Sequence, residues 1–362
     1  MDLMTFLLFL AGLALLTVGA EILIRGSSRL AAMLGISPLI IGLTVVAFST
    51  SSPELAVSVR SALAGQADIA LGNVVGSNIF NVLFILGLSA VITPLAVSRQ
   101  LIRLDVPIMI GVSFLLLFLG IGGRISRVEG VILFIGIILY TVFLIVQSRK
   151  EKNGQNDDYG KEFGKPQRKS ARQWVINLIM VLAGLGLLVL GARWMVDGAV
   201  VIARAMGVSE FIIGLTIIAA GTSLPEVAAS VIASIRKERD MAVGNVIGSN
   251  IFNILSVLGL SSALSPGGIA VSPAALNFDI PVMIAVAVAC LPIFFHGSGI
   301  SRWEGFLFLG YYIAYTAYLI LSSTQHDALP FFSWVMSFFV IPLTAITLLL
   351  ISYRQWRKDR PA

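Results

Sequence analysis

The sequence predicts an all-α polytopic membrane protein with two inverted five-helix repeats, which form a ten-helix core, and an eleventh C-terminal helix. Three observations predict this fold: an apolar composition, a series of apolar runs of membrane-spanning length, and a long internal repeat. Of the 362 residues, 57% are hydrophobic and 12% are charged, whereas a soluble domain carries about 25% charged residues. This composition excludes a large water-soluble enzymatic domain.

Apolar runs define the expected helices. The hydrocarbon core of a bilayer takes about 20 apolar residues per span. Eleven runs reach or approach this length, at residues 3–24, 38–63, 69–92, 104–121, 128–147, 173–196, 210–235, 241–264, 277–296, 303–321 and 331–352. All five tryptophans lie at or just beyond the ends of these runs, as in an interfacial aromatic belt. The lipid bilayer is therefore the expected environment of most of the chain.

The distribution of basic residues predicts the orientation. If the loop at 149–172 is cytoplasmic, 20 of the 25 Lys and Arg residues lie on the inner side, where positive charge accumulates. The N-terminus is then outside and the C-terminus is cytoplasmic, as expected for a multi-pass protein of the cell inner (plasma) membrane. The net charge of +6 thus reflects topology, and we expect no nucleic-acid partner.

The internal repeat appears at a shift of 172 residues. GLTVVAFSTSSPELAVSV, from Gly42, matches GLTIIAAGTSLPEVAASV, from Gly214, and 26 of the 47 positions from Gly42 to Leu88 are identical. Weaker matches extend the repeat over five helices, and an odd number of spans inverts the second copy in the membrane. We expect a first repeat at 1–148, a cytoplasmic linker at 149–172, a second repeat at 173–321, and an extra helix with a basic cytoplasmic tail at 322–362.

Glu54 and Glu226 occupy equivalent positions deep inside the second and seventh apolar runs. An acidic residue at mid-membrane costs at least about 2.5 kcal/mol unless it has a partner. Lys and Arg are absent at that depth, so we expect a transient cation as the partner. Pro53 and Pro225 lack the N–H that would bind the preceding turn. The sequence therefore predicts a broken helix in each repeat, with free backbone oxygens at 47–49 and 219–221.

Hydroxyl and amide side chains surround these glutamates in the sequence. Hydroxyl residues precede each glutamate by four and three positions, on the same helical face. The following helices carry GNVVGSNIFN and GNVIGSNIFN, in which a polar residue recurs every fourth position along one face. Such oxygen-rich clusters suit hard cations, and calcium takes six to eight oxygen ligands. The residues concerned are Thr50, Ser51, Asn73, Ser77, Asn81, Thr222, Ser223, Asn245, Ser249 and Asn253.

The motifs around Pro53-Glu54 and Pro225-Glu226, each followed by GSNIFN, resemble the alpha repeats of sodium/calcium exchangers of the calcium/cation antiporter superfamily. The resemblance runs from residue 1 to about residue 321, and the short loops make it most similar to prokaryotic members. It implies a secondary active antiporter that exchanges Ca²⁺ for Na⁺ by alternating access at a midplane site. No catalytic residue or cofactor is expected, because Ca²⁺ and Na⁺ are the transported substrates.

The resemblance also implies which residues bind the ions. Glu54 and Glu226 would ligate both cations, and the remaining ligands would be Thr50, Ser51, Ser77, Asn81, Thr222, Ser223, Ser249, Asn253 and the carbonyls of Ala47 and Ala219. Family members often carry Asp at one of the two positions occupied here by Asn81 and Asn253. This chain therefore has two carboxylates rather than three, which leaves the sodium stoichiometry open.

Other interpretations remain open at this stage. A Ca²⁺/H⁺ antiporter could use the same site, since paired buried carboxylic acids can exchange a proton for a cation. A passive cation channel is another alternative. An intramembrane metalloprotease would need a motif such as HExxH, which the sequence lacks. Potassium dependence, transport direction, a homo-oligomeric state and the role of the eleventh helix are not determined by the sequence.

Several charged residues are expected to act outside the cluster. Glu21 with Arg25, and Arg193 with Asp197, have the spacing of ion pairs near helix ends. Asp105 and its repeat equivalent Asp279 stand just before a proline, so we expect them to cap helix N-termini.

Overall fold

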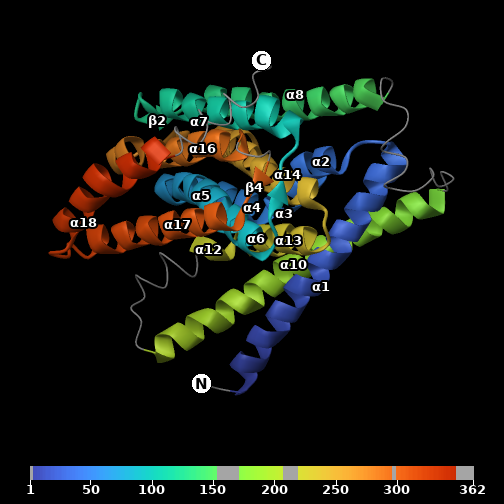
Figure 1. Cartoon of the computed structure of the whole chain (residues 1–362), viewed down its shortest axis with the longest axis horizontal. Coiled ribbons are helices and arrows are strands. Elements are labelled where there is room, and N and C mark those ends of the chain that lie inside the picture. Colours follow the sequence, from blue (N-terminus) through green and yellow to red (C-terminus); the bar gives the residue numbers. More distant parts are fainter. Residues whose placement is uncertain (1–2, 153–170, 207–218, 296–298, 348–362) are drawn as a thin grey trace, which may run out of the picture.

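The computed structural model describes residues 3–152, 171–206, 219–295 and 299–347, which are mainly helical (Figure 1). Nine helices within these ranges are long and apolar enough to cross a membrane. The bent pair Pro38–Thr50 and Ser52–Leu63 makes a tenth if it counts as one span. The expected run at 210–235 lies partly outside the described residues. The fold is therefore the all-α polytopic one that the composition predicted.

The elements of the two repeats follow in the same order. The first repeat contains α1 (Leu3–Leu34), α2 (Pro38–Ile41), η1 (Gly42–Val46), α3 (Ala47–Thr50), α4 (Ser52–Leu63), α5 (Ala67–Phe80), η2 (Asn81–Leu86), α6 (Gly87–Ile92), β1 (Leu95–Ala96), η3 (Leu101–Asp105), α7 (Val106–Gly120), β2 (Arg124–Ile125) and α8 (Arg127–Lys152). The second contains α10 (Ala171–Ala205), α12 (Ala219–Gly221), α13 (Leu224–Ile235), α14 (Arg239–Phe252), η5 (Asn253–Leu258), α15 (Gly259–Leu264), β3 (Ile269–Ala270), η6 (Ala275–Asp279), α16 (Ile280–Phe295), β4 (Gly299–Ile300) and α17 (Arg302–Ser323). The helix that follows comprises α18 (Leu329–Val335) and η7 (Met336–Val340) and continues to Thr347.

The expected helix breaks are present in both repeats. The first lies at Ser51, where α3 and α4 meet with a bend of 46°. The second lies at the turn formed by Thr222 and Ser223, between α12 and α13. Each proline stands at the second position of the helix after the break, where its missing N–H costs no helical hydrogen bond. The prolines thus end one helix and begin the next, as predicted.

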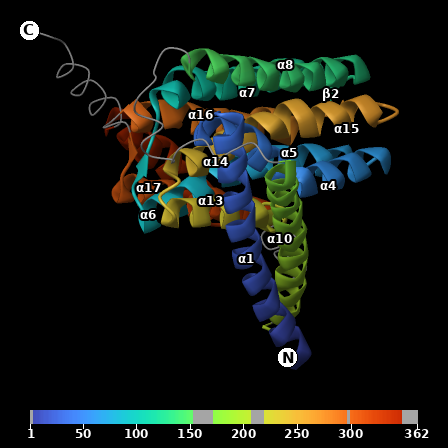
Figure 2. The same cartoon turned by 90° about the vertical axis from the view of Figure 1, so that its right-hand side faces the viewer.

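Helices α1 and α10 are longer than the apolar runs indicated, with 32 and 35 residues. At 1.5 Å per residue each is about 50 Å long, which exceeds the hydrocarbon thickness of about 30 Å. Figure 2 shows them side by side, running across the direction of the other helices. Glycines bring their backbones close: a Cβ atom on Gly12 would lie 2.8 Å from the Gly191 carbonyl oxygen, and one on Gly19 would lie 2.9 Å from that of Gly184.

Two short antiparallel ladders join the repeats. β1 pairs with β4, and β2 pairs with β3. In each ladder one strand comes from the first repeat and the other from the second, and the exchange is reciprocal, because β1 corresponds to β3 and β2 to β4 in the repeat. The sequence did not predict these strands, since two residues carry no periodicity. The ladders thus connect the two repeats through two equivalent sets of contacts.

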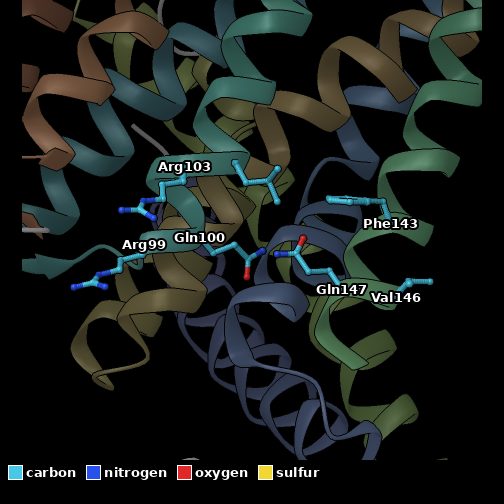
Figure 3. A pocket seen from close by; sticks show the side chains of 7 residues that line it. Arg99, Gln100, Arg103, Phe143, Val146 and Gln147 are labelled. Carbon is cyan, nitrogen blue, oxygen red and sulfur yellow. The ribbon is translucent and has the colours of Figure 1, made fainter. Parts of the chain in front are cut away.

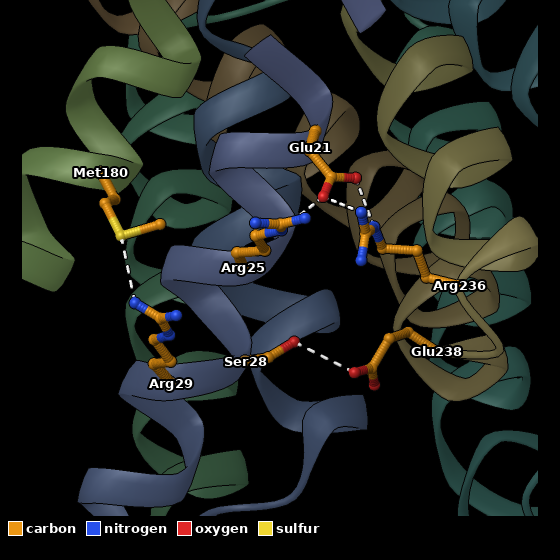
Figure 4. Close-up of polar contacts among 7 residues, drawn as sticks. All are labelled: Glu21, Arg25, Ser28, Arg29, Met180, Arg236 and Glu238. Carbon is orange, nitrogen blue, oxygen red and sulfur yellow. Dashed lines mark hydrogen bonds and ion pairs between the residues drawn. The ribbon is translucent and has the colours of Figure 1, made fainter. Parts of the chain in front are cut away.

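Polar contacts connect α1 to the residues that follow α13 (Figure 4). Glu21 lies between Arg25 of its own helix and Arg236, the residue that follows α13. At the equivalent place in α10, Arg193 and Asp197 lie 4.0 Å apart within one helix and are largely exposed. The predicted pairs thus both form, and among the described residues the first also links α1 to the residue after α13.

Candidate ion-binding site

The two glutamates lie in the first turns of α4 and α13, and each accepts a hydrogen bond from a residue of the other repeat. Ser223 Oγ donates to Glu54 Oε1 at 2.8 Å, and Ser51 Oγ donates to Glu226 Oε1 at 3.1 Å. Both carboxylates are completely buried, with 0% exposure. Because each serine belongs to the helix break of the other repeat, the crossed contacts bring both breaks and both carboxylates into one cluster.

A second layer of contacts holds the threonines. Thr50 Oγ1 lies 3.2 Å from Asn245 Oδ1, and Thr222 Oγ1 lies 3.3 Å from Asn73 Oδ1. The NH₂ group of each asparagine is also held by a hydrogen bond. Asn73 Nδ2 donates to Ser58 Oγ of α4 at 2.9 Å, and Asn245 Nδ2 donates to Ser230 Oγ of α13 at 2.9 Å. The polar stripes of α5 and α14 therefore reach the broken helices, as the spacing predicted.

The other expected ligands lie further along the same stripes. Ser77 Oγ is 3.1 Å from Ser223 Oγ, so it adjoins the Glu54 carboxylate. Asn81 and Asn253 begin the π-helical segments η2 and η5, one turn beyond Ser77 and Ser249. All four of these side chains are buried. Printed contacts thus join Ser51, Ser223 and Ser77 to the two glutamates or to each other, whereas Asn81 and Asn253 contact the asparagines Asn250 and Asn78.

Several oxygens in this region have no hydrogen-bond partner among the described residues. They are Glu54 Oε2, Glu226 Oε2, Asn81 Oδ1, Asn253 Oδ1 and Ser249 Oγ. A buried polar atom without a partner costs about 1–3 kcal/mol, so five of them in one region call for a ligand. Oxygen atoms attract a cation, which makes a hard metal ion the fitting occupant.

The backbone at the two breaks differs. The carbonyl of Ala47 is not free, since it accepts the Ser51 N–H at 2.9 Å and the Thr50 hydroxyl lies 3.4 Å from it. In the second break the Ser223 N–H instead bonds the carbonyl of Ala220 at 3.2 Å, one residue after Ala219. The expectation that the breaks free these carbonyls equally is therefore wrong for Ala47.

Among the described residues of the cluster, the charged groups are the two carboxylates. Within the described ranges, the recorded side-chain partners of Glu54 and Glu226 are hydroxyl groups rather than basic residues. The described part of the chain also holds no group of three or more His, Cys, Asp and Glu residues that could bind a metal. The carboxylate, hydroxyl and amide oxygens of the cluster are ligands that suit a hard cation.

Two expectations for nearby acids are corrected by the structure. Asp105 and Asp279 do not cap helix N-termini, because their helices already begin six residues earlier and continue through η3 and η6. Instead, Tyr140 donates to Asp105 at 2.9 Å, and Tyr315 donates to Asp279 at 3.1 Å. The equivalent spacing of Asp and Tyr in both repeats is a signal that could have revealed these pairs.

A cavity of about 570 Å³ lies apart from the cluster, between the start of α7 and the end of α8 (Figure 3). Gln100 and Gln147 face each other across it, and Arg99 and Arg103 point away from them. None of its lining residues belongs to the predicted ion site. The cavity is therefore separate from the candidate ion-binding site.

Comparison with known proteins agrees with this arrangement. The family described as sodium/calcium exchanger protein matches residues 4–146 and 176–321. The chain belongs to this family. Sodium/calcium exchanger MaX1 of Methanosarcina acetivorans is 32% identical to this chain, and the match covers 87% of this chain and 98% of MaX1. Inner membrane protein YrbG of Escherichia coli (strain K12) is 37% identical, with 86% and 95% covered.

A solved structure of the sodium-calcium exchanger NCX_Mj, soaked with zero Na⁺ and Ca²⁺, matches with a TM-score of 0.75 and 33% identity. The match covers 88% of this chain and 100% of that one. This exchanger-family chain is therefore a multi-pass cation antiporter of the prokaryotic type. Its family is one of transporters and not of enzymes.

Proposed function

We propose that this protein exchanges Ca²⁺ for Na⁺ by alternating access, with both ions bound in turn at the cluster around Glu54 and Glu226. The observation that carries the proposal is the set of buried oxygens without partners, which includes one oxygen of each carboxylate. One Ca²⁺ neutralises the two carboxylates, and the hydroxyl and amide oxygens complete a coordination of six to eight. The ligands proposed beside the glutamates are Thr50, Ser51, Ser77, Asn81, Thr222, Ser223, Ser249, Asn253 and the carbonyl of Ala219.

Coupling follows from the charge of the empty cluster. Two ionised carboxylates in a buried site repel each other and lose hydration. A change of orientation without a bound cation is therefore unfavourable, and calcium leaves only when sodium replaces it. We expect α1 and α10 to move against the other eight core helices, because they cross these helices as a pair.

Reconstitution into liposomes tests the coupling. Purified protein in vesicles loaded with Na⁺ should take up ⁴⁵Ca²⁺ when diluted into sodium-free buffer, and uptake should stop when the sodium gradient is removed. Uptake that ignores the gradient would contradict exchange and indicate a channel.

Calcium–proton exchange is the second candidate for the same site. It is favoured by the presence of amides at both Asn81 and Asn253, which leaves the cluster with two carboxylates. Calcium uptake driven by a pH gradient in sodium-free vesicles would establish this version and exclude sodium as the obligatory partner.

The placement in the cell is part of the proposal. The bias of basic residues supports an inner (plasma) membrane location with the N-terminus outside and the C-terminus in the cytoplasm. The repeats at 1–148 and 173–321 would then be joined by the cytoplasmic linker at 149–172. Accessibility of single cysteines at the two ends to a membrane-impermeant thiol reagent tests this orientation.

A further inference from the structure

Asn78 and Asn250 form a reciprocal pair where α5 and α14 meet. Asn78 Nδ2 donates to the backbone carbonyl of Asn250 at 3.2 Å, and Asn250 Nδ2 donates to that of Asn78 at 3.3 Å. Both side chains are buried, with 2% exposure. The two asparagines lie beside the polar stripes and were not among the residues that the sequence pattern selected.

These contacts fix which way each amide faces. A backbone carbonyl oxygen can only accept a hydrogen bond. Each of the two asparagines must therefore turn its NH₂ group to the carbonyl of the other and direct its Oδ1 elsewhere. A sulfur atom also lies close to each NH₂ group, with Met283 Sδ at 3.6 Å from Asn78 Nδ2 and Met109 Sδ at 3.5 Å from Asn250 Nδ2.

The fixed Oδ1 atoms set the orientation of the next two amides. Asn253 Nδ2 donates to Asn78 Oδ1 at 3.0 Å, and Asn81 Nδ2 donates to Asn250 Oδ1 at 3.0 Å. With their NH₂ groups held there, Asn253 and Asn81 keep their own Oδ1 atoms without partners. The two backbone carbonyls thus orient the amides of Asn78 and Asn250, and these in turn orient the amides of Asn253 and Asn81.

We propose that Asn78 and Asn250 are positioning residues, which make Asn81 and Asn253 present oxygen rather than NH₂ to the transported cation. The inference rests on the proposed function. Oxygen and NH₂ are nearly equal in size, so packing alone does not distinguish the two orientations of an amide. An NH₂ group directed at a cation would oppose binding. Only the hydrogen-bond chain from the paired backbone carbonyls therefore selects the binding orientation.

The test replaces Asn78 with Leu, which has the same branched shape and no hydrogen-bonding group, and with Ser, whose hydroxyl can donate and accept in the same sense. Asn78→Leu frees the Asn253 amide to turn, so we expect the Kd for calcium to rise about 10- to 100-fold, as for other outer-shell ligand partners. The KM for calcium should rise with it, while kcat changes less. Asn78→Ser should recover part of the affinity.

Met283→Leu is the matched control. It removes the sulfur beside the same NH₂ group but leaves the chain from carbonyl to cation intact, so its Kd for calcium should equal that of the wild type. Direct ⁴⁵Ca²⁺ binding is measured beside sodium-driven flux, with gel filtration of each variant as the test of folding.

The outcomes separate the two proposals. A folded Asn78→Leu protein with wild-type Kd and KM would overturn the positioning role and leave the exchange function standing. A fall in kcat with unchanged KM, or an equal loss in Met283→Leu, would show general damage to packing and also overturn it. Wild-type protein that neither binds nor transports calcium would overturn both proposals. If Asn78→Leu does not fold, Asn78→Ala takes its place as the variant without a hydrogen-bonding group, and unchanged affinity in folded Asn78→Ala protein would overturn the positioning role.

Discussion

At the scale of residues, the crossed contacts make each carboxylate depend on both repeats. Ser223 donates a hydrogen bond to Glu54, and Ser51 donates one to Glu226, although each serine lies only three positions before the glutamate of its own repeat. A displacement of one broken helix relative to the other would thus alter both carboxylate environments together.

Replacing either glutamate with glutamine tests the charge of the cluster. We expect Glu54→Gln and Glu226→Gln each to abolish calcium flux in proteoliposomes, because the amide keeps an oxygen but removes half of the negative charge that balances Ca²⁺. Folding should persist, since a buried amide costs less than a buried carboxylate. Normal flux in either variant would contradict the proposed site.

The serines should differ in their effects. Ser223 contacts both Glu54 and Ser77, whereas Ser51 contacts Glu226. We expect Ser223→Ala to raise the KM for calcium about tenfold or more and Ser51→Ala to raise it less. Ser52→Ala is the control, because that hydroxyl binds the carbonyl of Phe48 outside the cluster. Equal KM values in all three variants would refute the assignment.

The sequence repeat was sufficient to predict which residues gather here, but not how they pair. The shift of 172 residues made Glu54 and Glu226 equivalent, and the prolines predicted the breaks. The crossing of the serine contacts depends on how the repeats pack, which no local pattern records. Asn78 and Asn250 were missed because they lie off the four-residue spacing, and their role requires the contact between α5 and α14.

At the scale of elements, the glycines of α1 and α10 permit a close crossing. A Cβ atom on Gly184 would lie 2.6 Å from the backbone nitrogen of Leu23, while one on Gly186 would meet nothing within 4 Å. The length of these two helices was underestimated from the sequence, because small and charged residues near their ends interrupt the apolar runs without interrupting the helix.

These two glycines provide a matched pair for a stability test. We expect Gly184→Ala to destabilise the protein by about 1–3 kcal/mol through overpacking, and Gly186→Ala to be neutral or stabilising by up to about 1 kcal/mol. Thermal melting in detergent measures both. Equal melting temperatures would show that α1 and α10 do not pack as closely as described.

At the scale of the whole molecule, two parts can be distinguished. One is the pair α1 and α10, which pack together through glycines, and the other contains the helices that the two ladders join. The ladders join the repeats at the fourth helices, away from α1 and α10. If alternating access moves α1 and α10 against the rest, the ladders belong to the part that stays fixed.

Cross-linking a ladder tests this division. Arg124 and Ala270 are exposed and face each other as direct partners in the second ladder, at the Cα separation of about 4.5–5.5 Å that an antiparallel pair provides and a disulfide accepts. In a Cys290→Ser background, we expect Arg124→Cys with Ala270→Cys to form a disulfide and to retain sodium-driven calcium flux. Loss of flux on oxidation, restored by reduction, would show that the ladder moves.

The exchange of serines between the glutamates also bears on ancestry. A single five-helix unit carries one carboxylate and one hydroxyl that cannot serve each other, so it has no complete cation site. Two copies inserted head to tail in the same membrane would complete the site at once. A half-length ancestor would thus have needed insertion in both orientations to form this site.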